Sequence, residues 1–194
     1  MVDITKVKAI DIHTHAEEPC GCHADDGYDE LQAAMANYFG APWKQPPTIP
    51  ETAAHYREQN IAAVIFPVDA ERETGYRRYA NEEVAELAAE NSDVLIPFAS
   101  IDPHKGKMGV REARRLMSAF GIKGFKFHPT LQGFYPNDRM AYELYGAIER
   151  WATSTHRHLS AGNIQWIEAH AARDAAMNGK DNTMNKPEFF IFIN

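Results

Sequence analysis

Two histidines close to the N-terminus, His13 and His15, have the residue type and spacing to hold one metal ion. They end the segment 7–15, whose valine, alanine and isoleucine residues predict a short β-strand. Because side chains on a strand alternate between its two faces, we expect His13, His15 and Asp11 to point to the same side. Two imidazoles at a strand end can bind a metal and leave it open to a substrate. The pattern predicts His13 and His15 as metal ligands. Asp11 either orients one of them or fills the interior of the fold, and the first is favoured because a buried aspartate must be paired.

Polar side chains also follow other apolar runs of the chain: Asp69, Asp102, His104, Lys126 and His128. In the run 122–129, strand alternation places Lys126 and His128 on one face and the neighbouring phenylalanines on the other. Lys126 is predicted to bind an anionic substrate, and a neutralising charge in the protein interior is the alternative. For His128, contact with substrate or metal and a hydrogen-bonded histidine at a loop start are both open. Asp102 precedes a proline and is predicted to form a turn.

Four apolar runs alternate with helical patterns along the chain. The expected strands span residues 7–15, 61–67, 94–101 and 122–129, and the expected helices span residues 26–39, 51–59, 79–90, 110–120 and 138–151. Such repetition predicts a parallel sheet, either open and doubly wound or closed as a (β/α)8 barrel. No glycine-rich nucleotide-binding loop follows any strand, and the polar residues collect at strand ends, where barrel active sites lie. The predicted fold is therefore an α/β protein of the barrel type.

Composition and charge exclude several classes of protein. The chain has 194 residues, 44% of them hydrophobic, and a formal net charge of -7, so nucleic acid is not an expected partner. No apolar stretch reaches the roughly 18 residues of a membrane span, and no secretory signal is recognised. The two cysteines cannot form a disulfide framework, so we expect a cytoplasmic protein.

Three segments, residues 10–15, 100–103 and 123–129, together resemble the amidohydrolase superfamily, in particular the branch that contains aminocarboxymuconate-semialdehyde decarboxylase. The resemblance implies a (β/α)8 TIM barrel with a divalent metal, usually zinc, to which His13 and His15 contribute. It further implies that a metal-activated water hydrolyses a small carboxylated or acyl substrate. A lyase, either a decarboxylase or a hydratase, is the alternative, because the branch contains both chemistries. Lys126 and His128 are then substrate-binding residues, and no catalytic residue is assigned.

The last part of the chain departs from that family. A fifth strand ending in histidine is expected after Trp151, but residues 152–160 contain no apolar run. A complete barrel needs about 250 residues, so we expect a truncated half-barrel of about four β/α units in residues 1–151. An unrelated tail, with a helix and a short strand, is expected in residues 152–194. The exposed sheet edges could be covered by the closing run 189–193 or by a second copy in a homo-oligomer. An inactive half-barrel that acts only by association is thus a third hypothesis.

Two further groups contain residue types that bind metals. Residues 20–23, Cys-Gly-Cys-His, would make a soft-metal site, but zinc sites of that kind usually need a second cysteine pair. His156, His158 and His170 have no strand pattern around them, and we expect them to be tail residues.

Overall fold

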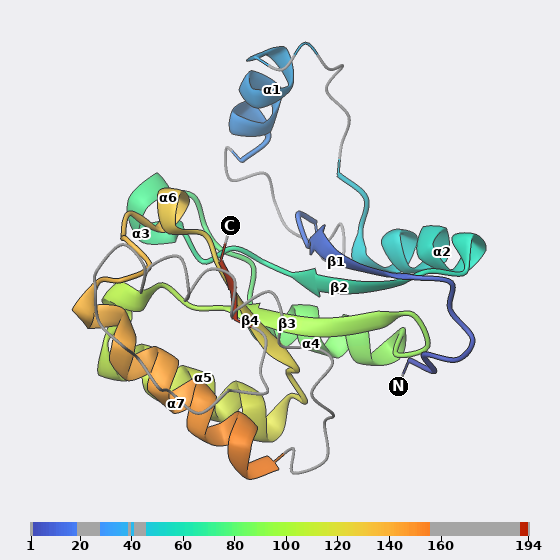
Figure 1. Cartoon of the computed structure of the whole chain (residues 1–194). Coiled ribbons are helices and arrows are strands. Elements are labelled where there is room, and N and C mark those ends of the chain that lie inside the picture. The colour runs from blue at the N-terminus through green and yellow to red at the C-terminus, as the bar shows by residue number, and fades with distance from the viewer. Residues whose placement is uncertain (1, 19–27, 39, 41–45, 156–190, 194) are drawn as a thin grey trace, which may run out of the picture.

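The computed structural model describes residues 2–18, 28–38, 40, 46–155 and 191–193. Within these residues, five strands form one parallel sheet in the order β1-β2-β3-β4-β5 (Figure 1). The strands are β1 (Ile10–His15), β2 (Ala62–Phe66), β3 (Leu95–Ser100), β4 (Gly124–Phe127) and β5 (Ile191–Ile193). The helices are α1 (Tyr28–Tyr38), α2 (Ile49–Gln59), α3 (Glu71–Thr74), α4 (Asn81–Glu90), η1 (Pro103–Lys105), α5 (Lys107–Ala119), α6 (Pro129–Gln132) and α7 (Arg139–Thr155).

Every strand and helix expected in residues 7–151 is present, with its ends shifted by four residues or fewer, and the helix expected in the tail lies outside the described residues. β2 and β4 are buried along their whole length, which explains their unbroken apolar runs. Consecutive strands are parallel neighbours, and helices carry the chain back between them. This is the arrangement of one half of a (β/α)8 barrel, so the predicted fold class is confirmed.

Helix α2 starts two residues before its expected position because of a capping box. The N–H of Glu51 donates to Thr48 Oγ1 at 3.4 Å, and the N–H of Thr48 donates to the Glu51 carboxylate at 2.8 Å. At the other end, Asn60 adopts the left-handed conformation with φ of 55°. α2 is thereby bounded at both ends.

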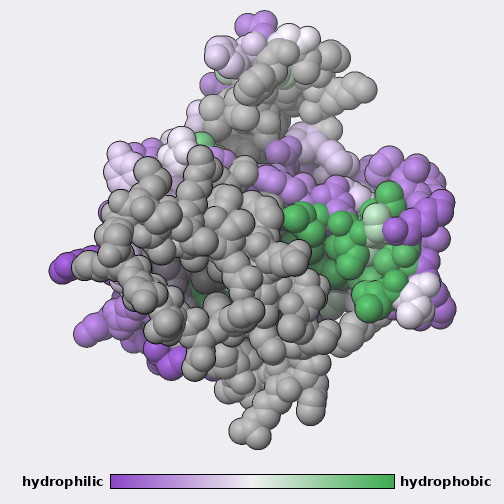
Figure 2. All heavy atoms as spheres, viewed as in Figure 1, coloured by the Kyte–Doolittle hydropathy of each residue, from purple (hydrophilic) through white to green (hydrophobic). Residues whose placement is uncertain are grey.

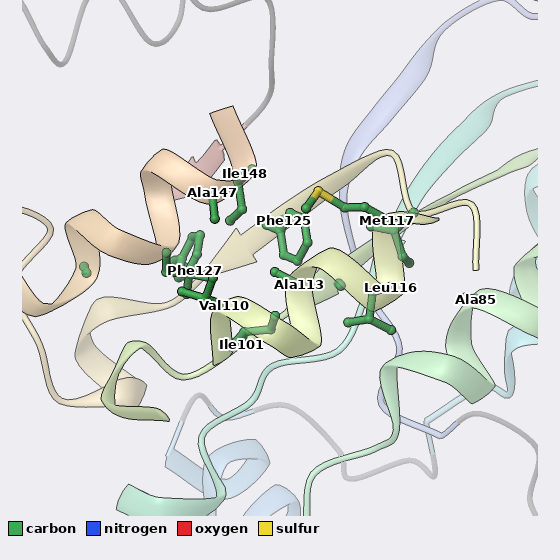
Figure 3. Packing of buried hydrophobic residues seen from close by; sticks show 14 of the residues in the cluster. Ala85, Ile101, Val110, Ala113, Leu116, Met117, Phe125, Phe127, Ala147 and Ile148 are labelled. Atoms are coloured by element: carbon green, nitrogen blue, oxygen red, sulfur yellow. The ribbon is translucent and has the colours of Figure 1, made fainter. Parts of the chain in front are cut away.

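Helices cover one face of the sheet, here called the outer face. α2 and α4 pack on β2 and β3 through a cluster that includes Ala53, Ala63, Ile65 and Val84. α5 and α7 pack on β4 through a larger cluster, part of which is shown in Figure 3: Ile101, Val110, Ala113, Leu116, Met117, Phe125, Phe127, Ala147 and Ile148. Phe125 and Phe127 therefore face the helices, as predicted.

The opposite face, here called the inner face, carries a smaller apolar cluster of Val64, Phe66 and Phe98, with Ile96 packed against it. The Phe98 ring lies directly on Gly124, where a Cβ atom would come within 2.3 Å of Phe98 Cζ. Hydrophobic side chains are visible over the strands on the face of the molecule shown in Figure 2. In a complete barrel the inner face of each strand forms the interior.

The two edges of the sheet differ. At one edge β5 pairs with β4, with Phe125 opposite Ile191, which confirms that the closing run pairs with a sheet edge. At the other edge β1 pairs with β2, and Ile10 and Ile12 are 40% and 50% exposed. α7 continues to Thr155, and most of the predicted tail lies outside the described residues. Among the helices that are described, none has the length and apolar character needed to cross a membrane.

Candidate functional site

A β-bulge in β1 determines where its side chains point. Asp11 pairs with Ala63 and Thr14 pairs with Ile65, so two residues of β1, Ile12 and His13, lie opposite the single Val64. One extra residue in a strand moves every later side chain to the other face of the sheet. The bulge therefore separates the first part of β1 from the histidines.

Asp11 and the histidines consequently lie on different faces, and the prediction that they share one is wrong. Asp11 pairs with Ala63, which belongs to the outer cluster, whereas His15 pairs with Phe66 of the inner cluster. The carboxylate of Asp11 accepts a hydrogen bond from the Tyr56 hydroxyl of α2 at 2.6 Å and one from the His13 N–H at 2.9 Å. Asp11 thus contacts the backbone of a predicted ligand from the helix side.

The side chains of His13 and His15 converge on the inner face. Their Nε2 atoms lie 3.0 Å apart and their rings stack with centroids 5.1 Å apart. Phe66 lies against both imidazoles, with ring centroids 5.5 Å from His13 and 5.0 Å from His15. The predicted pairing of the two histidines is therefore present in the structure.

Lys126 reaches the same place from β4. Its side chain is fully buried, and Nζ lies 5.1 Å from the centre of the Phe66 ring. An ammonium over an aromatic face is attracted by the electrons of the ring. Phe66 is thus the common contact of Lys126, His13 and His15, which come from two different strands.

His128 lies at the start of α6, directly after β4. Its Nδ1 accepts a hydrogen bond from the Leu131 N–H at 3.3 Å, so the side chain caps this short helix. Its own N–H donates to Gln132 Oε1 at 2.8 Å. With Nδ1 occupied as an acceptor, a neutral His128 carries its proton on Nε2. That nitrogen is a donor, suited to an anionic oxygen and unsuited to a metal.

Burial lowers the pKa values of Lys126 and of the three histidines near it, and repulsion from neighbouring positive charges lowers those of the histidines further. Burial lowers the pKa of Lys126 to about 8 and, with the charges of His13 and Lys126, lowers the pKa of His15 to about 4. Burial and the Lys126 charge also lower the pKa values of His13 and His128. At neutral pH the imidazoles are therefore neutral, the form in which histidine binds a metal.

The two Nε2 atoms of His13 and His15 fit a single divalent ion. Two nitrogen ligands at about 2.0–2.1 Å from a tetrahedral zinc lie about 3.3 Å apart, close to the separation observed here. In the part of the chain that the structure describes, no group of three or more His, Cys, Asp or Glu side chains is placed to hold an ion. The geometry of His13 and His15 is thus compatible with two ligands of a larger set.

A polar pocket of about 330 Å³ lies beyond the ends of β2 and β3, and is lined by Asp69, Glu71, Arg72, Asp102, His104 and Lys105. Both aspartates are buried, and each has a cation: Lys105 Nζ lies 2.6 Å from Asp69, and Arg72 Nε donates to Asp102 at 2.9 Å. Asp102 also accepts the N–H of His104, which confirms its predicted role in a turn. The charges of this pocket are neutralised internally, so we do not assign it a substrate.

Several contributors to this region were not predicted from the sequence: Tyr56, Phe66, Arg72, Asn81 and Gln132. Phe66 is one residue of an apolar run, and only the strand register shows that its ring lies beneath the histidines. The capping role of His128 did have a signal, because proline after it favours the first position of a helix. Residues 20–23 and the histidines at positions 156, 158 and 170 lie outside the described residues.

Comparisons with known proteins agree with the fold. The structure is similar to the crystal structure of 5-carboxyvanillate decarboxylase LigW from Sphingomonas paucimobilis, with a TM-score of 0.50 and 16% sequence identity. The similarity covers 74% of this chain and 49% of that one, so the chain spans about half the length of its structural neighbour. No curated protein sequence gave a match. Residues 10–180, most of the chain, match the amidohydrolase family, and the chain belongs to that family.

Proposed function

We propose that this chain is an amidohydrolase-type enzyme in which His13 and His15 bind a divalent metal ion, with zinc as the proposed ion. The observation that carries the proposal is the 3.0 Å approach of the two Nε2 atoms on the inner face of the sheet. Proteins of the amidohydrolase superfamily usually bind a divalent metal. Such an ion, when bound, polarises a substrate oxygen or activates water.

Lys126 and His128 are the proposed substrate-binding residues. Lys126 brings a fully buried ammonium to the inner face, beside the Phe66 ring, and a positive charge in such an apolar environment attracts an anionic group of a ligand. His128 offers an Nε2–H donor to a second oxygen, and Phe66 supplies an apolar surface between them. A small carboxylate substrate meets these requirements.

Two reaction classes use this arrangement. Hydrolysis of a carboxylated or acyl substrate is our first candidate. Decarboxylation or hydration is the second, and the decarboxylase activity named for the structural neighbour favours it. Release of carbon dioxide from aromatic and conjugated carboxylic acids, measured beside acid release from esters and lactones, distinguishes the two classes.

Metal content tests the proposal directly. The purified chain, freed of loosely bound ions, should contain close to one zinc or manganese ion per chain by elemental analysis. A His13→Ala, His15→Ala double variant should contain almost none, because both Nε2 ligands are removed. Equal and near-zero metal in the two proteins would remove the basis of the proposed site.

Association between copies is the remaining alternative. The exposed Ile10 and Ile12 on the edge strand β1 favour a second copy of the chain as the partner, because edge strands can pair with other chains. Light scattering of the same preparation measures this, and a monomer would exclude it. The low cysteine content supports the cytoplasm as the proposed compartment.

A further inference from the structure

The bulge in β1 decides whether the two histidines face the inner side at all. If the pairing of Asp11 with Ala63 continued without an extra residue, His13 would lie opposite Ile65 on the outer face. His15 would then point to the same outer face, because side chains two residues apart share a face. The extra residue turns both imidazoles toward Phe66 and Lys126.

Three hydrogen bonds surround this bulge on its helix side. The Tyr56 hydroxyl donates to Asp11 Oδ2 at 2.6 Å and lies 2.9 Å from Thr14 Oγ1. Because the Tyr56 proton is used on Asp11, the Thr14 hydroxyl donates to the Tyr56 oxygen. The other carboxylate oxygen of Asp11 accepts the His13 N–H. We refer to Tyr56, Asp11, Thr14 and the His13 N–H as the Tyr56 network.

The Tyr56 network spans the bulge, since Asp11 and Thr14 are the last and first regularly paired residues on its two sides. We propose that Tyr56, acting through Asp11 and Thr14, is a positioning residue that holds the β1 bulge and so directs His13 and His15 to one metal ion. This inference rests on the proposed metal site. In many metal sites, residues that do not touch the metal orient its ligands through hydrogen bonds. We infer that Tyr56 of α2 has this role here.

Tyr56→Phe removes the hydroxyl and keeps the ring that packs in the outer cluster. The matched control is Arg57→Gln, which weakens another polar attachment of α2: the hydrogen bonds from Arg57 to Asp93 at 2.7 and 2.8 Å and to Asn91 at 3.3 Å. Arg57 is the next residue along the helix, so a general loosening of α2 should appear in both variants. A change in hydrogen exchange or metal affinity that occurs only in Tyr56→Phe therefore reflects the loss of the Tyr56 contacts with β1.

Two measurements are needed. In the metal-free chain, amide hydrogen exchange at His13 should become roughly fivefold faster in Tyr56→Phe, the equivalent of one lost hydrogen bond, and stay at the wild-type rate in Arg57→Gln. In a titration followed by the visible absorption of cobalt(II), Tyr56→Phe should bind about tenfold more weakly, the lower end of the effect of removing an outer partner. Arg57→Gln should bind cobalt like the wild type.

The outcomes separate this inference from the proposed function. If the wild type binds cobalt no better than His13→Ala, His15→Ala, the metal site is wrong, and His13 exchange alone decides the role of Tyr56. Unchanged His13 exchange in Tyr56→Phe overturns the inference. So does wild-type cobalt affinity in that variant. If Tyr56→Phe does not fold, Thr14→Val removes one hydrogen bond of the network, that between Thr14 and Tyr56, from the strand side and is judged by the same two results.

Discussion

Replacing Lys126 with methionine should stabilise the metal-free chain at neutral pH and lose that advantage in alkaline solution. Lys126 is fully buried on the inner face, and burial lowers the pKa of its side chain from 10.5 to about 8. Methionine has a similar length and no charge, so it removes the cost of burying the ammonium while filling the same space.

The sign and size follow from the two pKa values. Below pH 8 the lysine is protonated in both the folded and the unfolded chain, and the cost is fully present, about 3 kcal/mol at roughly 1.4 kcal/mol per pKa unit. Between pH 8 and 10.5 the folded chain loses the proton first, so wild-type stability rises with pH by up to about 1.4 kcal/mol per unit. Above pH 10.5 the cost is gone.

Urea unfolding of the wild type and Lys126→Met at pH 7, 8, 9, 10 and 10.5 measures this difference. Other groups that titrate in this range contribute equally to both proteins and cancel. Lys123→Met is the control, because Lys123 is exposed and lies three residues earlier, so the same substitution there removes no buried charge. A free-energy difference between Lys126→Met and the wild type that stays constant from pH 7 to 10.5 would refute the reasoning.

Two substitutions test the packing behind the site, both by urea unfolding. Gly124→Ala would put a Cβ atom 2.3 Å from Phe98 Cζ in a buried cluster, so it should lower the free energy of unfolding by about 1–3 kcal/mol. Gly146→Ala in α7 is the control: its Cβ atom would meet only the flexible end of Arg150, so it should leave the free energy of unfolding unchanged or raise it. Asn81 is fully buried and makes two hydrogen bonds of 2.8 Å with the backbone of Ser100. Asn81→Leu should therefore lower the free energy of unfolding by about 1–3 kcal/mol for each backbone group left unpaired. A total loss below about 1 kcal/mol would contradict this.

The strands, the helices and the approach of His13 to His15 were predictable from the sequence because each rests on local pattern. Buried strands such as β2 are marked by unbroken apolar runs, and His13 and His15 are marked by their spacing. The assignment of Phe125 and Phe127 to the helix side, and of Lys126 to the opposite side, followed from strand alternation in β4, which is regularly paired along its length. Local pattern was sufficient wherever pairing was regular.

Residues that depend on contacts between distant segments were not predictable. Gln132 contacts Asp69 and His128 at once, with its Nε2 donating to the Asp69 carbonyl at 3.0 Å, and Asn81 substitutes for a strand partner of Ser100. Such amides are ordinary polar residues in the sequence. Ser100 lies 19 residues from Asn81, and Asp69 lies 63 residues from Gln132 along the chain. They become recognisable only when the register of the sheet is known.

The β1 bulge shows how one extra residue in a strand can change which side chains of a motif share a face of the sheet. Strand alternation alone gave the right conclusion that His13 and His15 lie together, and the wrong conclusion that Asp11 lies with them. Both conclusions came from the rule that side chains two residues apart share a face. The extra residue falls between Asp11 and Thr14, so it separates Asp11 from the two histidines and leaves the histidines next to each other. A carboxylate on the ligand face would have been a third candidate metal ligand. Asp11 lies on the outer face, hydrogen-bonded to Tyr56, so the proposed metal site needs its further donors from beyond β1.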